Sequence, residues 1–241
     1  TQYIESKYYA YYETGGILVL ERFEGEKDNA KLMRISVEKR STESYTVGTV
    51  KYAAQKVEQF DPTGTIRIGF SRTWKQVKSG IVYTITETRT PDASLTLLTT
   101  EYSHRMTKAE MSAAGLTSVL GAATQTDVYE TDQNIRTSVR QSYRQKLQAN
   151  YLSGKLNNDG KIPVTITKVW EAELTSMTND NYTSIVHTYK NIETIDTVKR
   201  LVTYTDTFIG TGSGASSDIF DTRTKTYYQE RTDTLEGSAK K

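Results

Sequence analysis

Residues 127–154 read DVYETDQNIRTSVRQSYRQKLQANYLSG, and the secondary structure of this stretch decides the fold class. Large apolar side chains recur there at every fourth position, namely Ile135, Val139, Tyr143, Leu147 and Tyr151. Acidic residues at the start and Gly154 with Lys155 at the finish suit the two ends of a helix. The spacing therefore predicts a long helix. A strand remains the alternative, because Ile135, Thr137 and Val139 are β-branched.

Two shorter helices are predicted elsewhere in the chain. Val50, Ala53, Ala54, Val57 and Phe60 fall on one helical face, and Asp61 with Pro62 would end that helix. Further on, residues 107–110 (TKAE) form a capping-box pattern, which opens an Ala-rich stretch that ends near Gly121.

The remaining chain reads as strands and turns. A hairpin is expected over residues 17–23 and 31–38, and another over 65–77 and 81–90 around a turn at 78–80. Alternating apolar residues over 164–174 and 192–208 indicate further strands. The predicted fold class is therefore α+β: strand-rich, with antiparallel sheets, one long helix and two short helices. We expect a single domain over residues 1–241 with extended terminal arms, and the weakest possible cut lies at 154–160.

Composition excludes several classes of protein. The 241 residues include no Cys, so disulfide scaffolds, thiolate metal sites and Cys nucleophiles are ruled out. A net charge of +2 does not indicate a general nucleic-acid binder. No apolar run is long enough to cross a membrane, and the first residues lack the pattern of a signal peptide, so we expect a protein made in the cytoplasm. Threonine and tyrosine are abundant, and both favour strands and contact surfaces.

No constellation of residues predicts catalysis. His104 and His187 stand in no recognised nucleophile or metal spacing, and the pair Glu171 and Glu173 is ordinary for the solvent face of a strand. The glycine-rich residues 210–214 resemble a mobile hairpin tip more than a phosphate loop. We therefore expect no enzyme, no cofactor and no bound metal.

Basic residues dominate one part of the predicted long helix. Residues 133–158 contain no acidic residue, and Arg136, Arg140 and Arg144 would form one stripe at helical spacing. This stripe could contact an acidic partner chain or nucleic acid, and the third interpretation is a solvated helix face. We favour the protein partner, because solvated helix faces usually mix charges of both signs.

The two ends of the chain carry candidate contact residues. Residues 222–232 have strand propensity but almost no apolar side chain, so this strand would be an edge or would pair with another chain. Several tyrosines also lie near the N-terminus. They could contact neighbouring subunits, or they could pack an N-terminal strand onto the core of the same chain, and we regard these two interpretations as equal. The candidate interface residues at the two ends are Tyr8, Tyr9, Tyr11, Tyr12, Thr224, Thr226, Tyr227 and Tyr228.

Taken together, the missing catalytic motif, the absence of Cys, the abundant Thr and Tyr and the apolar-poor C-terminal strand favour a subunit of a large assembly. In these features the chain resembles the virion proteins of tailed bacteriophages that form capsid, connector or tail parts. The resemblance is one of composition over the whole chain, so it assigns no functional residue. It implies a structural protein of the virion, whose partners are copies of itself and other assembly subunits.

The alternative function is a β-rich module that binds carbohydrate or another cell-surface ligand. Exposed tyrosines together with Trp74 or Trp170 would then stack on sugar rings, although both Trp residues share strand faces with Ile or Val and are expected in the core. A hydrolase ranks third and would depend on a His or on a carboxylate pair.

Overall fold

The computed structural model describes residues 6–25, 31–131, 135–148, 161–171, 182–195, 197–210, 218–227 and 234–235. The first strands are β1 (Ser6–Thr14), β2 (Ile17–Gly25), β3 (Lys31–Val47), β4 (Val50–Phe60), β5 (Arg67–Lys78), β6 (Ile81–Arg89) and β7 (Leu97–Arg105). After the helix α1 (Lys108–Ala113) follow β8 (Thr124–Glu130), β9 (Arg136–Gln148), β10 (Lys161–Glu171), β11 (Ser184–Ile195), β12 (Val198–Ile209), β13 (Ile219–Thr226) and β14 (Thr234–Leu235).

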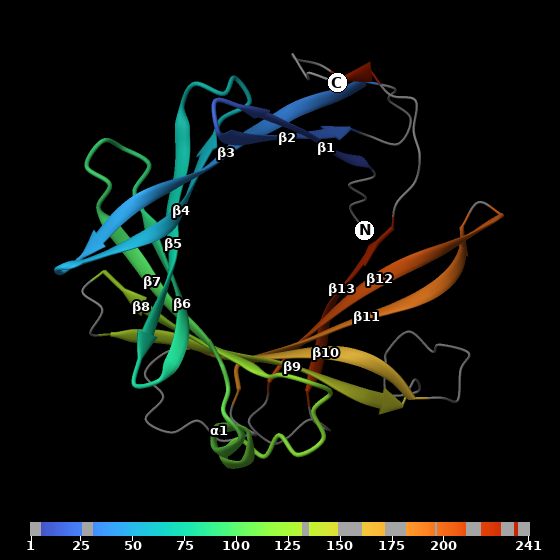
Figure 1. Ribbon diagram of the computed structural model, residues 1–241. Helices are drawn as coiled ribbons and strands as arrows, with labels where there is room; N and C mark the ends of the chain where they lie inside the picture. Colours follow the sequence, from blue (N-terminus) through green and yellow to red (C-terminus); the bar gives the residue numbers. More distant parts are fainter. Residues whose placement is uncertain are drawn as a thin grey trace. The chain divides into compact units, whose positions relative to one another are not determined.

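The strands from β1 to β13 are hydrogen-bonded in the order in which they occur along the chain (Figure 1). Successive neighbours such as β1 and β2, β3 and β4, and β11 and β12 pair antiparallel. The short β14 lies off this path and pairs parallel with β3. The described chain is almost entirely antiparallel strand, so the predicted α+β class with a long helix is wrong.

The chain divides into two compact units. One comprises the described parts of residues 1–80, 84–100 and 230–241, and the other those of 81–83 and 101–229. The boundary crosses the sequence at β6 and β7. The possible cut at 154–160 lies outside the described residues, and the expected domain layout stays a prediction.

The long helix expected over residues 127–154 is replaced by strands. Residues 127–130 end β8, residues 136–148 form β9, and residues 149–154 lie outside the described residues. A repeat of four residues is also two periods of a strand, so Val139, Tyr143 and Leu147 share a face of β9 as they would share a helix face. This segment forms a strand because β9 pairs with neighbours on both edges. It pairs with β10 from Gln148 opposite Lys161 to Ser138 opposite Glu171, and it pairs with β8 on its other edge.

The short helix expected over residues 50–60 is also wrong, because this segment is β4. Its backbone pairs with β3 from Val47 opposite Val50 to Val37 opposite Phe60, and with β5 on the other side. Of the residues on the predicted helical face only Ala54 is fully buried. Hydrogen bonding to two neighbouring strands therefore overrides the local helical pattern.

The third predicted helix is confirmed in shortened form. Thr107 caps α1, its side chain accepts from the backbone N–H of Glu110, and the Glu110 carboxylate accepts from the backbone N–H of Thr107. The helix ends at Ala113 rather than near Gly121. The predicted hairpin of residues 17–23 and 31–38 is confirmed by the antiparallel pair β2 and β3, and the expected strands over 65–77 and 81–90 correspond to β5 and β6.

Each unit has its own apolar core. In the first unit, Phe23, Phe70, Trp74 and Ile85 are buried. In the second, buried residues of β9 to β12 form one cluster, against which Met111, Leu116 and Val119 from α1 and the following loop pack. Among the described residues no helix is long and apolar enough to span a membrane.

Candidate interaction surface

The strand β13 lies at one end of the strand order and pairs with β12 only, so no described strand occupies its second edge (Figure 1). Every residue of β13 is exposed except Arg223, which is half-buried. Thr224 and Thr226 face solvent, and so does Tyr227 just beyond the strand. The edge position predicted from the sequence is thus confirmed for this strand, while Tyr228 and the rest of the predicted segment lie outside the described residues.

A buried charged network, rather than apolar burial, holds β13 against β12. Arg223 donates from Nε to Oδ1 of Asp206 at 2.6 Å and from Nη2 to Oδ2 at 2.8 Å. The hydroxyl of Tyr189 donates to the same Asp206 Oδ2 at 2.9 Å and accepts from Arg223 Nη2 at 3.1 Å. Asp206 is completely buried, so this charge is tolerated only because these donors satisfy it.

Aromatic rings surround the network. Tyr189 stacks on Tyr204 with ring centroids 5.1 Å apart and planes 5° apart, and the Arg223 guanidinium lies 5.5 Å from the Tyr204 ring. Burial, followed by the bond to Asp206, raises the pKa of the Tyr189 hydroxyl, so the phenol stays neutral. The hydrogen bond to Asp206 raises the pKa of Arg223 despite partial burial. The sequence analysis did not predict this network. The sequence hint was Asp206, a carboxylate at a position of β12 that alternation places on the core face, between Tyr204 and Phe208.

Threonines run in register across the exposed face of β10 to β13. Thr165, Thr188, Thr205 and Thr224 are successive partners on these four strands. In the next row Thr203 faces Thr226. Since side chains two residues apart project from the same face, these rows share one surface, which we call the threonine face.

The three arginines predicted to form one stripe do not share one face in the structure. A register shift in the pairing of β8 and β9 sets Arg136 opposite Tyr129, and Arg136 pairs with Asp127 at 3.3 Å. Alternation is broken there, so Arg136 leaves the face that Arg140 and Arg144 share. Arg140 pairs with Glu101 at 3.5 Å. Arg144 is exposed and lies opposite Thr165 on the threonine face.

The N-terminal tyrosines lie on β1, the strand at the other end of the order. Tyr8 is opposite Phe23 and Tyr9 opposite Arg22 in the pairing with β2. Tyr11 is 64% exposed, whereas Tyr12 is half-buried. Burial, with a smaller effect of the Glu21 carboxylate, raises the pKa of Tyr12. Tyr11 is thus a surface residue and Tyr12 is half-buried, and the interface role of these tyrosines stays a prediction.

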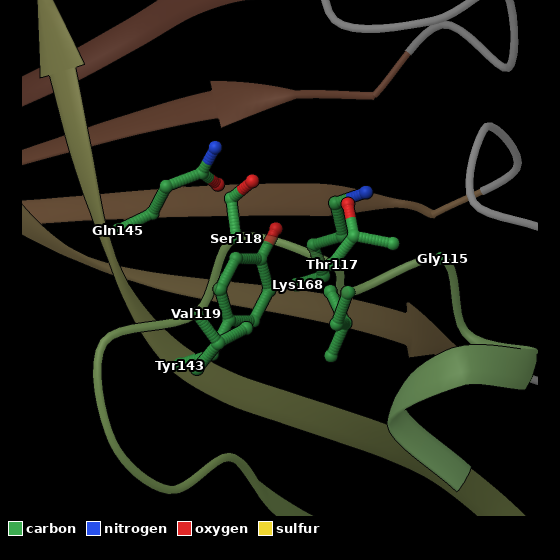
Figure 2. A pocket seen from close by; sticks show the side chains of 8 residues that line it. Gly115, Thr117, Ser118, Val119, Tyr143, Gln145 and Lys168 are labelled. Carbon is green, nitrogen blue, oxygen red and sulfur yellow. The ribbon is translucent and has the colours of Figure 1, made fainter. Parts of the chain in front are cut away.

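A shallow hollow of about 200 Å³ lies beside β9 and β10 (Figure 2). Residues 115–119 form one side, and Tyr143, Gln145 and Lys168 form the other. The loop is fixed there because the backbone N–H of Leu120 donates to the Arg144 carbonyl at 2.6 Å. Burial raises the pKa of Tyr143 to about 12, so its phenol cannot serve as a base near neutral pH. The groups that line the hollow are hydroxyls, an amide and an ammonium group. Among these lining residues no nucleophile contacts a general base.

The two histidines hold structural positions. His104 is buried and its Nε2 lies 3.2 Å from Oε1 of Glu110, the α1 residue whose carboxylate also accepts from the backbone N–H of the cap Thr107. His187 lies on the core face of β11 with its ring 5.2 Å from that of Phe208. Among the described residues no cluster of His, Asp and Glu could hold a metal ion. Trp74 and Trp170 are buried, so neither is available on the surface for stacking on a sugar.

No protein-family model, curated protein or solved structure matches this chain. The candidate surface therefore has to be interpreted from its own geometry.

Proposed function

We propose that this protein is a structural subunit of a large assembly, a bacteriophage particle by its compositional resemblance, and that it acts by binding other subunits. The observation that carries the proposal is β13. Its free edge offers a row of backbone N–H and C=O groups that no described strand pairs with. Strand addition from another subunit satisfies these groups.

Exposed apolar residues on the neighbouring strands support the same function. Ile192 on β11 and Leu201 on β12 are direct partners and are 64% and 56% exposed. At the other end of β12, Ile209 is the partner of Ile219 on β13, and both side chains are exposed. Paired apolar side chains that remain in water mark a contact surface better than single ones do.

The test compares two lysine variants. Thr224→Lys with Thr226→Lys places charges on β13, and Thr42→Lys with Thr88→Lys places the same charges at exposed positions of the internal strands β3 and β6. Lysines on an edge oppose strand addition. We expect the wild-type protein to associate in light scattering at micromolar to submillimolar concentration, and the β13 variant to associate at least about tenfold more weakly, close to 1.4 kcal/mol.

The control variant should associate like the wild type, and circular dichroism should show the same strand content for all three proteins. A wild-type protein that stays monomeric throughout, or a β13 variant that associates as strongly as the control, would overturn the proposal.

A further inference from the structure

Four cations lie on the threonine face, two on β9 and two on the β11–β12 hairpin. Arg144 lies beside Thr165, and Lys146 lies two residues further along β9, opposite Pro163. On the next strands Lys190 is opposite Thr203, and Lys199 is opposite Thr194. All four cations are exposed, and register places them on the same face as the threonine rows.

These cations differ from Arg136, Arg140 and Lys225 of the same unit, because no carboxylate neutralises them. Arg136, Arg140 and Lys225 each pair with an acidic side chain. In the part of the chain that the structure describes, Arg144, Lys146, Lys190 and Lys199 form no ion pair. The described carboxylate on this face, Glu171, lies at the opposite end of β10, next to Ser138.

We infer that the threonine face binds the phosphate backbone of double-stranded nucleic acid. Lysine, arginine and threonine hydroxyls are the side chains that commonly donate hydrogen bonds to phosphate oxygens. The rows supply hydroxyl donors about 4.8 Å apart from strand to strand, between the cationic side chains. Such contacts position a duplex without reading its sequence.

The composition of this face distinguishes the duplex from other polyanions. Single-stranded nucleic acid is held largely by stacking of its bases on aromatic rings, and sugar rings of polysaccharides also pack on aromatic faces. Among the described residues of β9 to β13, aromatic side chains lie on the core face, and the threonine face has none. This face overlaps the proposed assembly surface at Ile192, Leu201 and the threonines of β13. The four cations, however, lie on β9, β11 and β12, so replacing them leaves the free edge of β13 unchanged.

The experiment measures binding to a short random-sequence duplex DNA by fluorescence anisotropy as a function of salt. The first variant carries Arg144→Gln, Lys146→Gln, Lys190→Gln and Lys199→Gln. The control removes the same charges from exposed positions elsewhere, with Lys51→Gln, Lys75→Gln, Arg105→Gln and Lys108→Gln. Each cation that contacts a phosphate contributes about 0.9 to the slope of log K against log salt.

We expect the wild-type protein and the control to bind the duplex at low salt with a steep salt dependence. The first variant should bind at least tenfold more weakly, and its slope should be smaller by about 3 to 4. Its association state should equal that of the wild type, which separates this result from failure of the assembly proposal. If that variant does not fold, Lys190→Gln with Lys199→Gln alone should reduce the slope by about 2.

Heparin and poly-glutamate serve as the competing probes. Binding of heparin without the duplex would assign the face to an acidic polysaccharide, and binding of poly-glutamate alone would assign it to an acidic protein. Either result overturns the inference, as does a wild-type protein that ignores duplex DNA at low salt or an equal loss of binding in the control.

Discussion

The guanidinium of Arg223 on β13 spans the carboxylate of Asp206 on β12, with Nε 2.6 Å from Oδ1 and Nη2 2.8 Å from Oδ2. This pair joins the last strand of the sheet to a carboxylate that has no access to water. Besides its backbone pairing with β12, the edge strand is thus held by a buried charge pair, with the ring contact of Phe220 with Phe208 and the exposed pair of Lys225 with Glu193 in addition. The exposed rest of β13 is left free for other contacts.

Asp206→Ala should therefore lower the free energy of unfolding by about 3–5 kcal/mol, because the substitution leaves a partly buried guanidinium and the Tyr189 hydroxyl without their acceptor. Urea unfolding measures this loss. Asp221→Ala is the matched control, because Asp221 is an exposed carboxylate on the neighbouring strand β13 and its removal should change stability by less than about 0.5 kcal/mol. Equal losses for the two variants would show that the Arg223 pair does not hold β13.

The position of β13 could be predicted from sequence, but its attachment could not. Residues 222–226 alternate Thr with Arg and Lys, which is enough to predict an exposed edge. The partner of Arg223 is set by the register between two strands, and one sequence does not contain that register. A bulge between Thr207 and Phe208 shifts it further.

The helix errors have a different physical cause. In residues 135–147 the apolar spacing of four fits both a helix and a strand, and the helix-like ends of the segment oppose the strand preference of its β-branched residues. In residues 50–60 the local pattern is helical, yet β3 and β5 supply hydrogen-bond partners that a single segment does not reveal. Conversely, the capping box of α1 was predictable because its bonds are local.

A register shift of the same kind, between β8 and β9, is also why the arginine stripe could not be predicted correctly from the sequence. Equal spacing of Arg136, Arg140 and Arg144 suggested one stripe, but the shift between Val128 and Tyr129 separates Arg136 from the other two. The threonine face was visible only as an excess of threonine. Its rows depend on the pairing of four strands and appear once their register is known.

Gln141 provides a direct test of the strand assignment for β9. Its side chain is buried and Nε2 donates to Oε1 of Gln125 on β8 at 3.1 Å. Gln141→Ala leaves Oε1 of Gln125 without its donor and should lower the free energy of unfolding by about 1–3 kcal/mol. On the helix predicted from the sequence the same residue would face solvent beside the arginines, and its replacement would be nearly neutral.

Arg144→Ala is the control for this measurement, since Arg144 is exposed on the opposite face of β9 and should change stability by less than about 0.5 kcal/mol. Chemical denaturation of both variants measures the difference. A Gln141→Ala effect no larger than that of Arg144→Ala would contradict a stabilising role for the buried bond between Gln141 and Gln125.

His187 should give the protein a pH-dependent stability between neutral and mildly acidic pH. Burial lowers the pKa of its imidazole below the ordinary 6.5, and the nearby carboxylates of Asp206 and Asp218 only partly offset this effect. Between the lowered pKa and 6.5 the unfolded chain binds more protons than the folded one. Stability therefore falls as the pH drops through this interval, and it levels off once the folded imidazole is also protonated.

His187→Gln should remove this component, because glutamine does not titrate. The measurement is the urea midpoint of the wild-type protein and of the variant from pH 8 down to pH 5. Carboxylates titrate below this range. In spite of burial, for example, Lys56 and Arg67 hold the pKa of Glu58 below 4.5. The wild-type midpoint should fall more steeply with decreasing pH than that of the variant. Parallel profiles would mean that His187 accepts its proton equally well in the folded and unfolded chains, and that the core face of β11 does not exclude water from the imidazole.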